Sequence, residues 1–358
     1  MQSASTGVME ADTAALREII ERGVNVQASD VHLHTGYPPM MRIAGSMVAM
    51  GEEKLENTKL MQQFNAILSE KDREIFAKRK DVDFTYEIPG LARLRGSVFV
   101  GHIGVNASFR VLPPTAVPLQ DLGLPPQLER FIDYHHGLVL LTGPAGCGKS
   151  TTLAALVNLI NEKHSGRHVL SLEDPIEILH PHKKCVINQR QINLHTNSCE
   201  RAMRAALRED PDIIVIGEMR DAETMQLALT AAETGHLVMA SMHTTDAIKS
   251  ITRIVDSFHP EKQPQIRTML GESLQAVFSQ LLLPCTDGKT RALAYELLFV
   301  NAAVGNMIRE KKTFQIPSIM QTGKAQGMVT LSQTIGDLVR AGKVSRDVAK
   351  KYAEEGYF

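Results

Sequence analysis

One stretch of the sequence has the residue types and the spacing of a phosphate-binding loop. It matches the pattern G-x-x-x-x-G-K-[ST] at every fixed position, and it consists of Gly143, Pro144, Ala145, Gly146, Cys147, Gly148, Lys149 and Ser150. The glycines allow successive backbone N–H groups to point at a β-phosphate. Lys149 can then reach the β- and γ-phosphate oxygens, and the hydroxyl of Ser150 can bind Mg²⁺. The stretch therefore predicts a nucleotide site.

The residues on either side of this loop favour the same interpretation. The apolar run 137–141 predicts a buried strand, and residues 151–159 predict a helix that begins at Thr151. A helix N-terminus carries partial positive charge that attracts phosphate, so Thr151 is included among the nucleotide-binding residues. A glycine-rich turn with no ligand is the alternative, and the order of strand, loop and helix argues against it.

Three carboxylates follow the next apolar run, residues 168–172. They are Glu173, Asp174 and Glu177. Carboxylates at the end of a strand can bind a metal ion directly or through water, and they can orient a water molecule for attack. A solvated acidic turn is the alternative. Because the phosphate-binding loop is present, we favour a site and count Glu173 among the nucleotide-binding residues.

A further candidate carboxylate, Glu218, follows the apolar run 213–216 and Gly217. Its position is that of a modified Walker B element, in which the carboxylate accepts hydrogen bonds from the Mg²⁺ hydration shell or polarises the attacking water. Gly217 would permit a close approach to the phosphates. The alternative is a helix-capping turn through Asp221 in which Arg220 and Glu218 form a surface pair.

Two histidines bracket the apolar run 237–241. His243 leaves this predicted strand at its carboxyl end, where it could sense a γ-phosphate through a hydrogen bond. His236 precedes the strand. For His236 a role at the nucleotide and a purely structural role are equally open.

Arginines in the N-terminal third of the chain supply another candidate group. Arg93, Arg95 and Arg110 lie on or beside predicted strands. One interpretation is an exposed face of alternating charge. The other is an arginine finger, which another domain or another subunit delivers to the phosphates, because a planar guanidinium suits the charge that develops there.

Composition limits the classes of partner. The chain has 358 residues and a net charge of −1, with an isoelectric point near 6.9. This balance does not favour nucleic acid as a partner. The four cysteines include no C-x-x-C pair, so neither a zinc site nor a disulfide framework is expected. We find no signal peptide and no apolar run of about 18 residues, so we expect a cytoplasmic protein.

Hydrophobic patterns and prolines divide the chain into segments. They are a tail and a helix (1–27), a small α+β domain (28–112), a proline-rich linker that could act as a hinge (113–127), an α/β domain (128–300) and a helical C-terminal region (301–358). We predict single helices over 57–78 and 261–283 and a strand over 291–299. Apolar strands that alternate with helices predict a parallel sheet, with ligands at the carboxyl ends of its strands.

With these motifs placed, the chain resembles the PilT-type retraction motors of type IV pili, within the larger family of secretion ATPases. The resemblance runs from about Ala28 to Lys351. The stretches that carry it are residues 29–33, 38–40, 143–152, 173–177 (the family's Asp box), 207–212, 217–221 (the Walker B region), and 231–236 with 243–245 (the His box).

The resemblance implies a fold, an activity and an assembly. These are a PAS-like N-terminal domain, a RecA-like ATPase domain and a homohexamer that binds ATP and Mg²⁺ between the two domains. It implies that Glu218 and Glu177 act in metal binding and water activation, and that Arg95 and Arg110 reach the phosphates. It also implies a place at the pilus base, on the cytoplasmic side of the inner membrane. A platform protein of that membrane is the implied partner, and a second pilus motor ATPase is a further candidate.

Two stretches depart from the pattern of the retraction class. Its C-terminal motif Ala-Ile-Arg-Asn-Leu-Ile-Arg-Glu is read here from Ala303 to Glu310, with Gly305 in place of the first arginine. The loop carries Ala145 and Cys147 where the family usually has threonine and serine. The sequence also lacks the cysteine-rich zinc insert of pilus assembly and type II secretion motors. Two alternatives stay open: a secretion-system ATPase of the same family, and a nucleotide-dependent modulator of another pilus motor.

Overall fold

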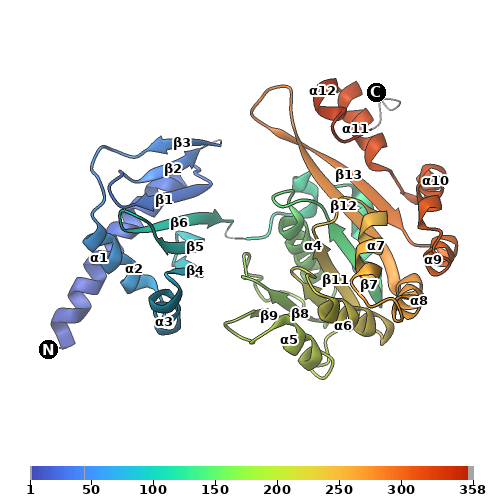
Figure 1. Cartoon of the computed structure of the whole chain (residues 1–358), viewed down its shortest axis with the longest axis horizontal. Helices are drawn as coiled ribbons and strands as arrows, with labels where there is room; N and C mark the ends of the chain where they lie inside the picture. Colours follow the sequence, from blue (N-terminus) through green and yellow to red (C-terminus); the bar gives the residue numbers. More distant parts are fainter. Residues whose placement is uncertain (1, 44, 114, 354–358) are drawn as a thin grey trace. The chain divides into compact units, whose positions relative to one another are not determined.

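The computed structural model describes residues 2–43, 45–113 and 115–353, with side chains from residue 13 onward. The chain forms two compact units, Met1–Thr115 and Ala116–Phe358. Figure 1 draws the first in blue to teal and the second in green to red. The division lies inside the proline-rich segment that the sequence marks as a linker.

The first unit is built on a six-stranded antiparallel sheet. Its elements are α1 (Gln2–Asn25), β1 (Asp30–His34), β2 (Met40–Ile43), β3 (Ser46–Ala49), α2 (Asn57–Ile67), α3 (Glu70–Arg79), β4 (Asp81–Ile88), β5 (Ala92–Val100) and β6 (Val105–Leu112). The strand order is β3-β2-β1-β6-β5-β4. Leu16 and Ile20 of α1, Phe64 of α2 and Phe109 of β6 share one buried cluster. The helices therefore pack on this sheet, and the unit is the small α+β domain that the sequence predicts.

Three details of the first unit differ from the sequence prediction. The helix expected over 57–78 is two helices, because Leu68 is extended and Ser69 starts α3 by accepting a hydrogen bond from the backbone N–H of Asp72. The tail expected before the first helix is part of α1 from Gln2 onward. The sequence does not predict β3, since all of its side chains are exposed and no alternating pattern marks it.

The second unit is an α/β fold with a seven-stranded sheet, as the sequence predicts (Figure 1). Its elements as far as the last strand are η1 (Leu119–Leu122), η2 (Pro126–Asp133), β7 (Gly137–Thr142), α4 (Lys149–Lys163), β8 (His168–Glu173), β9 (Val186–Gln191), α5 (Cys199–Ala206), β10 (Ile213–Ile216), α6 (Ala222–Glu233), β11 (Leu237–Met242), α7 (Ala247–Asp256), α8 (Gln263–Ser273), β12 (Leu274–Pro284) and β13 (Arg291–Phe299). The strand order is β13-β12-β7-β11-β10-β8-β9. Every pair is parallel except β12 with β13.

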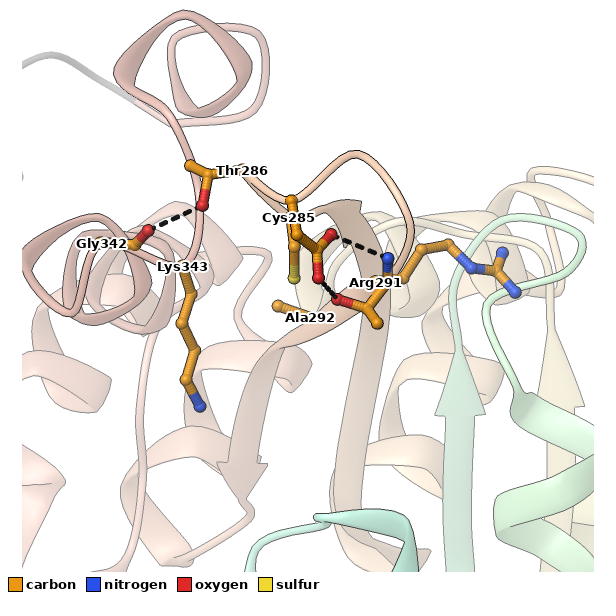
Figure 2. Close-up of a pocket in the computed structure, with 8 residues that line it drawn as sticks. Cys285, Thr286, Arg291, Ala292, Gly342 and Lys343 are labelled. Atoms are coloured by element: carbon orange, nitrogen blue, oxygen red, sulfur yellow. Dashed lines mark hydrogen bonds between the residues drawn. The ribbon is translucent and has the colours of Figure 1, made fainter. Parts of the chain in front are cut away.

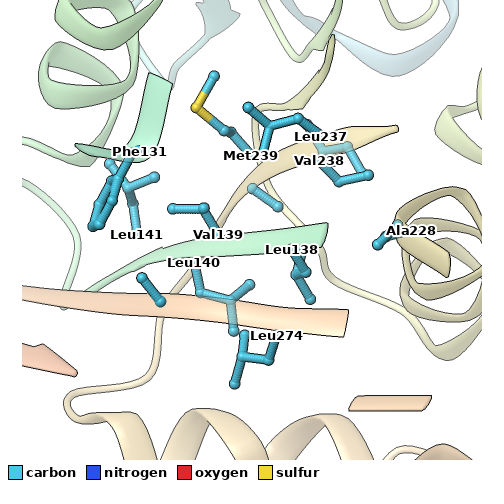
Figure 3. Packing of buried hydrophobic residues seen from close by; sticks show 14 of the residues in the cluster. Phe131, Leu138, Val139, Leu140, Leu141, Ala228, Leu237, Val238, Met239 and Leu274 are labelled. Carbon is cyan, nitrogen blue, oxygen red and sulfur yellow. The ribbon is translucent and has the colours of Figure 1, made fainter. Parts of the chain in front are cut away.

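Strand β7 lies inside this sheet between β12 and β11, and all of its residues are buried. Figure 3 shows the side chains of Leu138 to Leu141 pointing alternately to the two faces of the sheet. Strand β11 beside it is buried along its whole length as well. Burial on both faces explains why these strands are continuous apolar runs in the sequence. It also fixes the position of the loop that follows β7.

The single helix predicted over 261–283 is wrong. Helix α8 ends at Ser273, Leu274 is extended, and the residues from Leu274 to Pro284 form β12 between β7 and β13. A strand that is buried on both faces has no period of two, and a short apolar run of this kind fits a helix equally well. The sequence also does not predict β9, an edge strand with one buried side chain.

The proline-rich segment contributes to the second unit. Leu119 is 5% exposed and belongs to the main core of that unit, together with Leu128 and Phe131. The part of the predicted linker that follows Ala116 is therefore packed.

The C-terminal region is helical, as expected. Its elements are α9 (Ala302–Arg309), η3 (Thr313–Gln315), α10 (Ile316–Thr322), η4 (Gly323–Gln326), α11 (Leu331–Arg340) and α12 (Arg346–Ala349). Among the residues described, none of the helices has the length and apolar character needed to cross a bilayer.

Candidate nucleotide site

The predicted phosphate-binding loop connects β7 to α4. Gly143 and Gly148 have φ angles of 140° and 96°, which L-residues with side chains rarely adopt. A Cβ atom on Gly143 would lie 2.3 Å from the backbone oxygen of Gln280 on β12. Glycine at this position therefore serves both the turn and the close packing of the loop against β12.

Lys149, the first residue of α4, is buried beside the loop. Its Nζ donates hydrogen bonds to the backbone oxygens of Gly143, at 2.7 Å, and Pro144, at 3.0 Å. Burial lowers the pKa of Lys149, while Cys147 and Glu218 raise it. The ammonium group of Lys149 thus donates to carbonyl oxygens of the loop. It lies next to the backbone that would bind phosphate.

The carboxylate of Glu218 joins this cluster from the end of β10. Its Oε1 lies 2.8 Å from Nε2 of His243, whose Nδ1 lies 3.4 Å from Nζ of Lys149. Its Oε2 accepts a hydrogen bond from Nε of Arg220 at 2.9 Å. The surface pair considered as an alternative is therefore present, but Glu218 also contacts the histidine beside the loop. The structure brings Lys149, His243 and Glu218 together from three strand ends.

These residues fit a nucleotide with a magnesium ion. Ser150 is exposed in the first turn of α4, and the positive-φ glycines turn the loop backbone. No group of three or more His, Cys, Asp or Glu in the described parts of the chain is placed to hold a metal. Mg²⁺ in nucleotide sites needs no such cage, because phosphates, water and one or two side chains are its usual ligands. Ser150, with Glu218 and Glu177 acting through water, would supply those side chains.

The carboxylates after β8 have different surroundings. The Oε1 atom of Glu173 accepts hydrogen bonds from the hydroxyl of Ser171, at 2.6 Å, and from Nε2 of Gln189, at 3.1 Å. Asp174 lies 3.8 Å from Arg220, which also holds Glu218. Arg220 thus links this segment to Glu218. Glu177 is partly buried in the segment that follows β8.

The backbone of β8 lies close to Gly217, and the expected approach of Gly217 to the phosphates stays a prediction. A Cβ atom on this residue would lie 3.2 Å from the backbone oxygen of Leu172 and 3.4 Å from Cα of Glu173. The hydroxyl of Ser241 also donates a hydrogen bond to the Gly217 oxygen. The close approach that glycine permits here is to the neighbouring strand β8.

His236 is not part of the cluster within one chain. It precedes β11, whereas His243 follows that strand at the opposite edge of the sheet. Its Nδ1 lies 3.0 Å from the backbone oxygen of Ala231, near the end of α6. These contacts correspond to the structural role that the sequence left open.

Arg95 and Arg110 belong to the first unit, where they are direct cross-strand partners on β5 and β6. Nε of Arg110 lies 3.0 Å from Oδ1 of Asp30, and the Arg110 side chain is 62% exposed. Arg93 lies 3.5 Å from Glu87. The predicted role of Arg95 and Arg110 at the phosphates stays a prediction.

Sequence reasoning did not identify Gln280 of β12. Its side chain is 3% exposed, and its Nε2 would lie 3.7 Å from a Cβ atom on Gly148. The preceding residue, Ser279, accepts a hydrogen bond from the hydroxyl of Thr142 at 2.7 Å. The signal available in the sequence was that Ser279 and Gln280 are polar residues inside an apolar run.

A pocket of about 370 Å³ lies at the tip of the β12–β13 hairpin (Figure 2). In Figure 2 the side chains of Arg291 and Lys343 point in different directions. The Asp287 carboxylate, which closes the turn, accepts hydrogen bonds from the backbone N–H groups of Lys289 and Thr290. None of the predicted site residues lines this pocket. The lining residues are Cys285, Thr286, Asp287, Thr290, Arg291, Ala292, Gly342 and Lys343.

Comparison with known proteins identifies the family. The family described as Type II/IV secretion system protein matches residues 8–355. The chain is 43% identical over 339 residues to a Pseudomonas aeruginosa protein named Type IV pilus retractation ATPase PilT, with 95% of this chain and 98% of that protein covered. It is 45% identical over 316 residues to a Neisseria gonorrhoeae twitching motility protein, with 88% and 84% covered.

A solved structure agrees with these matches. The crystal structure of the pilus retraction motor PilT with bound ADP superposes with a TM-score of 0.88 at 40% identity, and covers 95% of this chain and 98% of that one. The chain therefore belongs to the family of Type II/IV secretion system proteins, and its similarity within that family is to the PilT-type pilus retraction ATPases.

Proposed function

We propose that this chain is a Mg²⁺-dependent ATPase that works as a homohexameric motor in type IV pilus retraction. The observation that carries the proposal is the cluster of Lys149, His243 and Glu218 around the phosphate-binding loop. The similarity to a pilus retraction ATPase and to a twitching motility protein supports the choice of biological process. The related structure with bound ADP supports a nucleotide at this loop.

Each residue of the cluster has a distinct task in this proposal. Lys149 exchanges the carbonyl oxygens of Gly143 and Pro144 for phosphate oxygens, so its charge meets the nucleotide. Glu218 accepts a hydrogen bond from the attacking water and polarises it. His243 holds Glu218 in place, and its imidazole ring also senses the γ-phosphate through a hydrogen bond. The metal ion, when bound, neutralises charge on the phosphate oxygens.

The cations that meet the developing charge are assigned to the first unit. Two arginines of the second unit are already paired: Arg220 with Glu218, and Arg204 with Glu200 and Glu223 at 2.8 and 2.7 Å. Arg95 and Arg110 are the proposed arginine fingers because the family resemblance places them at the phosphates, and Arg110 would have to leave Asp30 to act as one. Such residues would make turnover depend on domain closure and on assembly into a ring, because a head-to-tail contact that closes gives a ring.

The proposed place of work is the cytoplasmic side of the inner membrane at the base of the pilus. An inner-membrane platform protein is the proposed partner, and a second pilus motor ATPase is a further one. The chain's similarity to pilus proteins supports this location.

A different candidate function is a nucleotide-dependent modulator that does not hydrolyse ATP. Gly305 favours this candidate, because the retraction class has an arginine at that position. Phosphate release by the purified full chain with Mg²⁺ and ATP, with particle mass measured by light scattering, separates the two functions. The motor proposal expects steady turnover and a hexamer. Nucleotide binding without turnover would favour the modulator.

A further inference from the structure

Glu296 of β13 is a partly buried carboxylate that binds the N-terminus of helix α7. Its Oε1 accepts a hydrogen bond from the backbone N–H of Ala247, the first residue of α7, at 2.8 Å. A helix N-terminus attracts negative charge. A side chain of the sheet thus holds the start of a helix that is distant in the sequence.

Helix α7 is in turn fixed to the segment that carries His243. The hydroxyl of Thr244 lies 2.6 Å from that of Ser250 on α7, and Ser250 donates to the backbone oxygen of Asp246 at 2.6 Å. Asp246 caps α7 by accepting a hydrogen bond from the backbone N–H of Lys249. Ser250 and Ala247 are fully buried. The residues between His243 and α7 therefore move with this helix.

The same glutamate lies beside the strand that flanks the phosphate-binding loop. Glu296 is the cross-strand partner of Ser279 on β12. Ser279 accepts the hydrogen bond of Thr142, the residue before Gly143. Directly opposed side chains on neighbouring strands are about 5 Å apart, so Glu296 belongs to the polar row that supports the loop.

Burial of the Glu296 carboxylate is unfavourable unless it is compensated. It raises the pKa of Glu296, and the hydrogen bond from the Ala247 backbone lowers this pKa. If the carboxylate is removed, the N–H group of Ala247 at the start of α7 loses its acceptor in a poorly hydrated place. The N-terminus of α7 would then be held only by the contacts of Asp246 and Ser250.

We propose that Glu296 is a positioning residue for the nucleotide site: by holding α7 it keeps His243 at the distance from Glu218 that turnover requires. The inference rests on the proposed ATPase function. It assigns Glu296 no contact with nucleotide. Its contribution passes through helix α7, which Glu296 contacts at Ala247 and which contacts Thr244, next to His243, through Ser250.

The test is a double-mutant cycle on the full chain in steady-state ATP hydrolysis. Glu296→Ala is expected to lower kcat about tenfold, because small misplacements of a catalytic group cost this much or more, while KM for ATP changes less than about twofold. In a His243→Ala background the same change should cost less than about twofold, since the residue it positions is already gone. If the loss of kcat in the double variant equals the product of the losses in the two single variants, the proposal is overturned.

The matched control is Thr334→Val. The Thr334 hydroxyl donates to the backbone oxygen of Tyr295 at 2.7 Å and accepts from its N–H at 3.1 Å, so it fastens α11 to β13 without contacting α7. This variant should keep kcat within about twofold of wild type, as expected for a site with no link to His243. A fall equal to that of Glu296→Ala would show that loosening α11 is enough, which contradicts the proposal.

If Glu296→Ala does not fold, Ala247→Pro tests the same bond from the other side. Proline lacks the N–H that Glu296 accepts, it is favoured at the first position of a helix, and the extended Asp246 before it is compatible with proline. It is expected to give the same loss of kcat and the same lack of additivity with His243→Ala. Wild-type kcat in this variant would refute the role of the bond.

Hydrogen exchange separates failure of this inference from failure of the proposed function. Amides of residues 243–250 should exchange faster in Glu296→Ala than in wild type and Thr334→Val, whether or not the protein hydrolyses ATP. If the wild-type protein does not hydrolyse ATP but Glu296→Ala still shows this faster exchange, the proposed ATPase function is refuted. Glu296 then remains the residue that holds α7. Unchanged exchange in this segment overturns the inference in an active or an inactive protein.

Discussion

Nε2 of His243 lies 2.8 Å from Oε1 of Glu218, and this contact joins the ends of two neighbouring parallel strands, β11 and β10. The same carboxylate is held by Arg220 through its other oxygen. Each carboxylate oxygen can accept more than one hydrogen bond, so Glu218 can also accept one from a water while it keeps these partners. The pair is therefore well placed to couple the state of the phosphate site to the water-activating carboxylate.

The first prediction concerns this carboxylate. Glu218→Gln keeps the shape of the side chain and removes its charge, so nucleotide binding should persist while turnover falls by roughly 10²-fold or more. Steady-state phosphate release and ADP affinity measure the two effects. Glu223→Gln is the matched control, because this exposed glutamate pairs with Arg204 away from the cluster. Unchanged turnover in Glu218→Gln would move the catalytic role to Glu177.

The second prediction concerns the arginines of the first unit. Arg95→Ala and Arg110→Ala should each lower turnover by at least about 10²-fold, on the scale of a lost arginine finger. The exposed Arg73 on α3 provides the control, and Arg73→Ala should behave as wild type. ATPase assays on the full chain give the answer, and full activity in both arginine variants would remove the first unit from the mechanism.

A truncated chain tests the same dependence independently. A fragment that begins at Ala116 keeps Leu119, which is buried in the core of the second unit. It should bind nucleotide and hydrolyse it at least about 10²-fold more slowly than the full chain. Full activity of this fragment would contradict a role for Arg95 and Arg110.

The third prediction concerns Gly305. A Cβ atom on this buried residue of α9 would lie 2.5 Å from the backbone oxygen of Gly271 on α8, so no side chain fits at this helix crossing. Gly305→Arg, which restores the residue of the retraction class, should lower the free energy of unfolding by about 1–3 kcal/mol or more, the range for overpacked cores. Urea denaturation measures the change. Ala303→Arg, at an exposed position of α9, should stay within about 0.5 kcal/mol of wild type.

The sequence was most informative for features that can be predicted from one continuous segment. The phosphate-binding loop, the buried strands β7 and β11, and the carboxyl-end positions of Glu218 and His243 follow from local patterns. The regions it could not resolve depend on tertiary context. The run 274–284 fits a helix or a buried strand, and only its place between β7 and β13 decides in favour of β12.

Contacts between distant segments explain the residues that sequence reasoning missed. Gln280 lies against Gly143, and Glu296 accepts the N–H of Ala247 across the sheet. No spacing in the sequence connects these pairs, because they are set by strand order. The order of His236 and His243 around the apolar run already separates them in the sequence, and the structure adds the contact of His236 with the backbone oxygen of Ala231.

The central claim is that the loop from Gly143 to Ser150 is a site of ATP hydrolysis, and Lys149→Ala tests it most directly. Its Nζ is the cation on this loop, and removal of a donor that meets developing charge costs about 10²–10³-fold in kcat. The measurement is steady-state phosphate release with Mg²⁺ and ATP by wild type, Lys149→Ala and the control Lys163→Ala, whose lysine pairs with Glu129 at the far end of α4. We predict turnover in wild type and in Lys163→Ala, and at least about a 10²-fold loss in a folded Lys149→Ala protein. Turnover near wild type in Lys149→Ala would contradict the account.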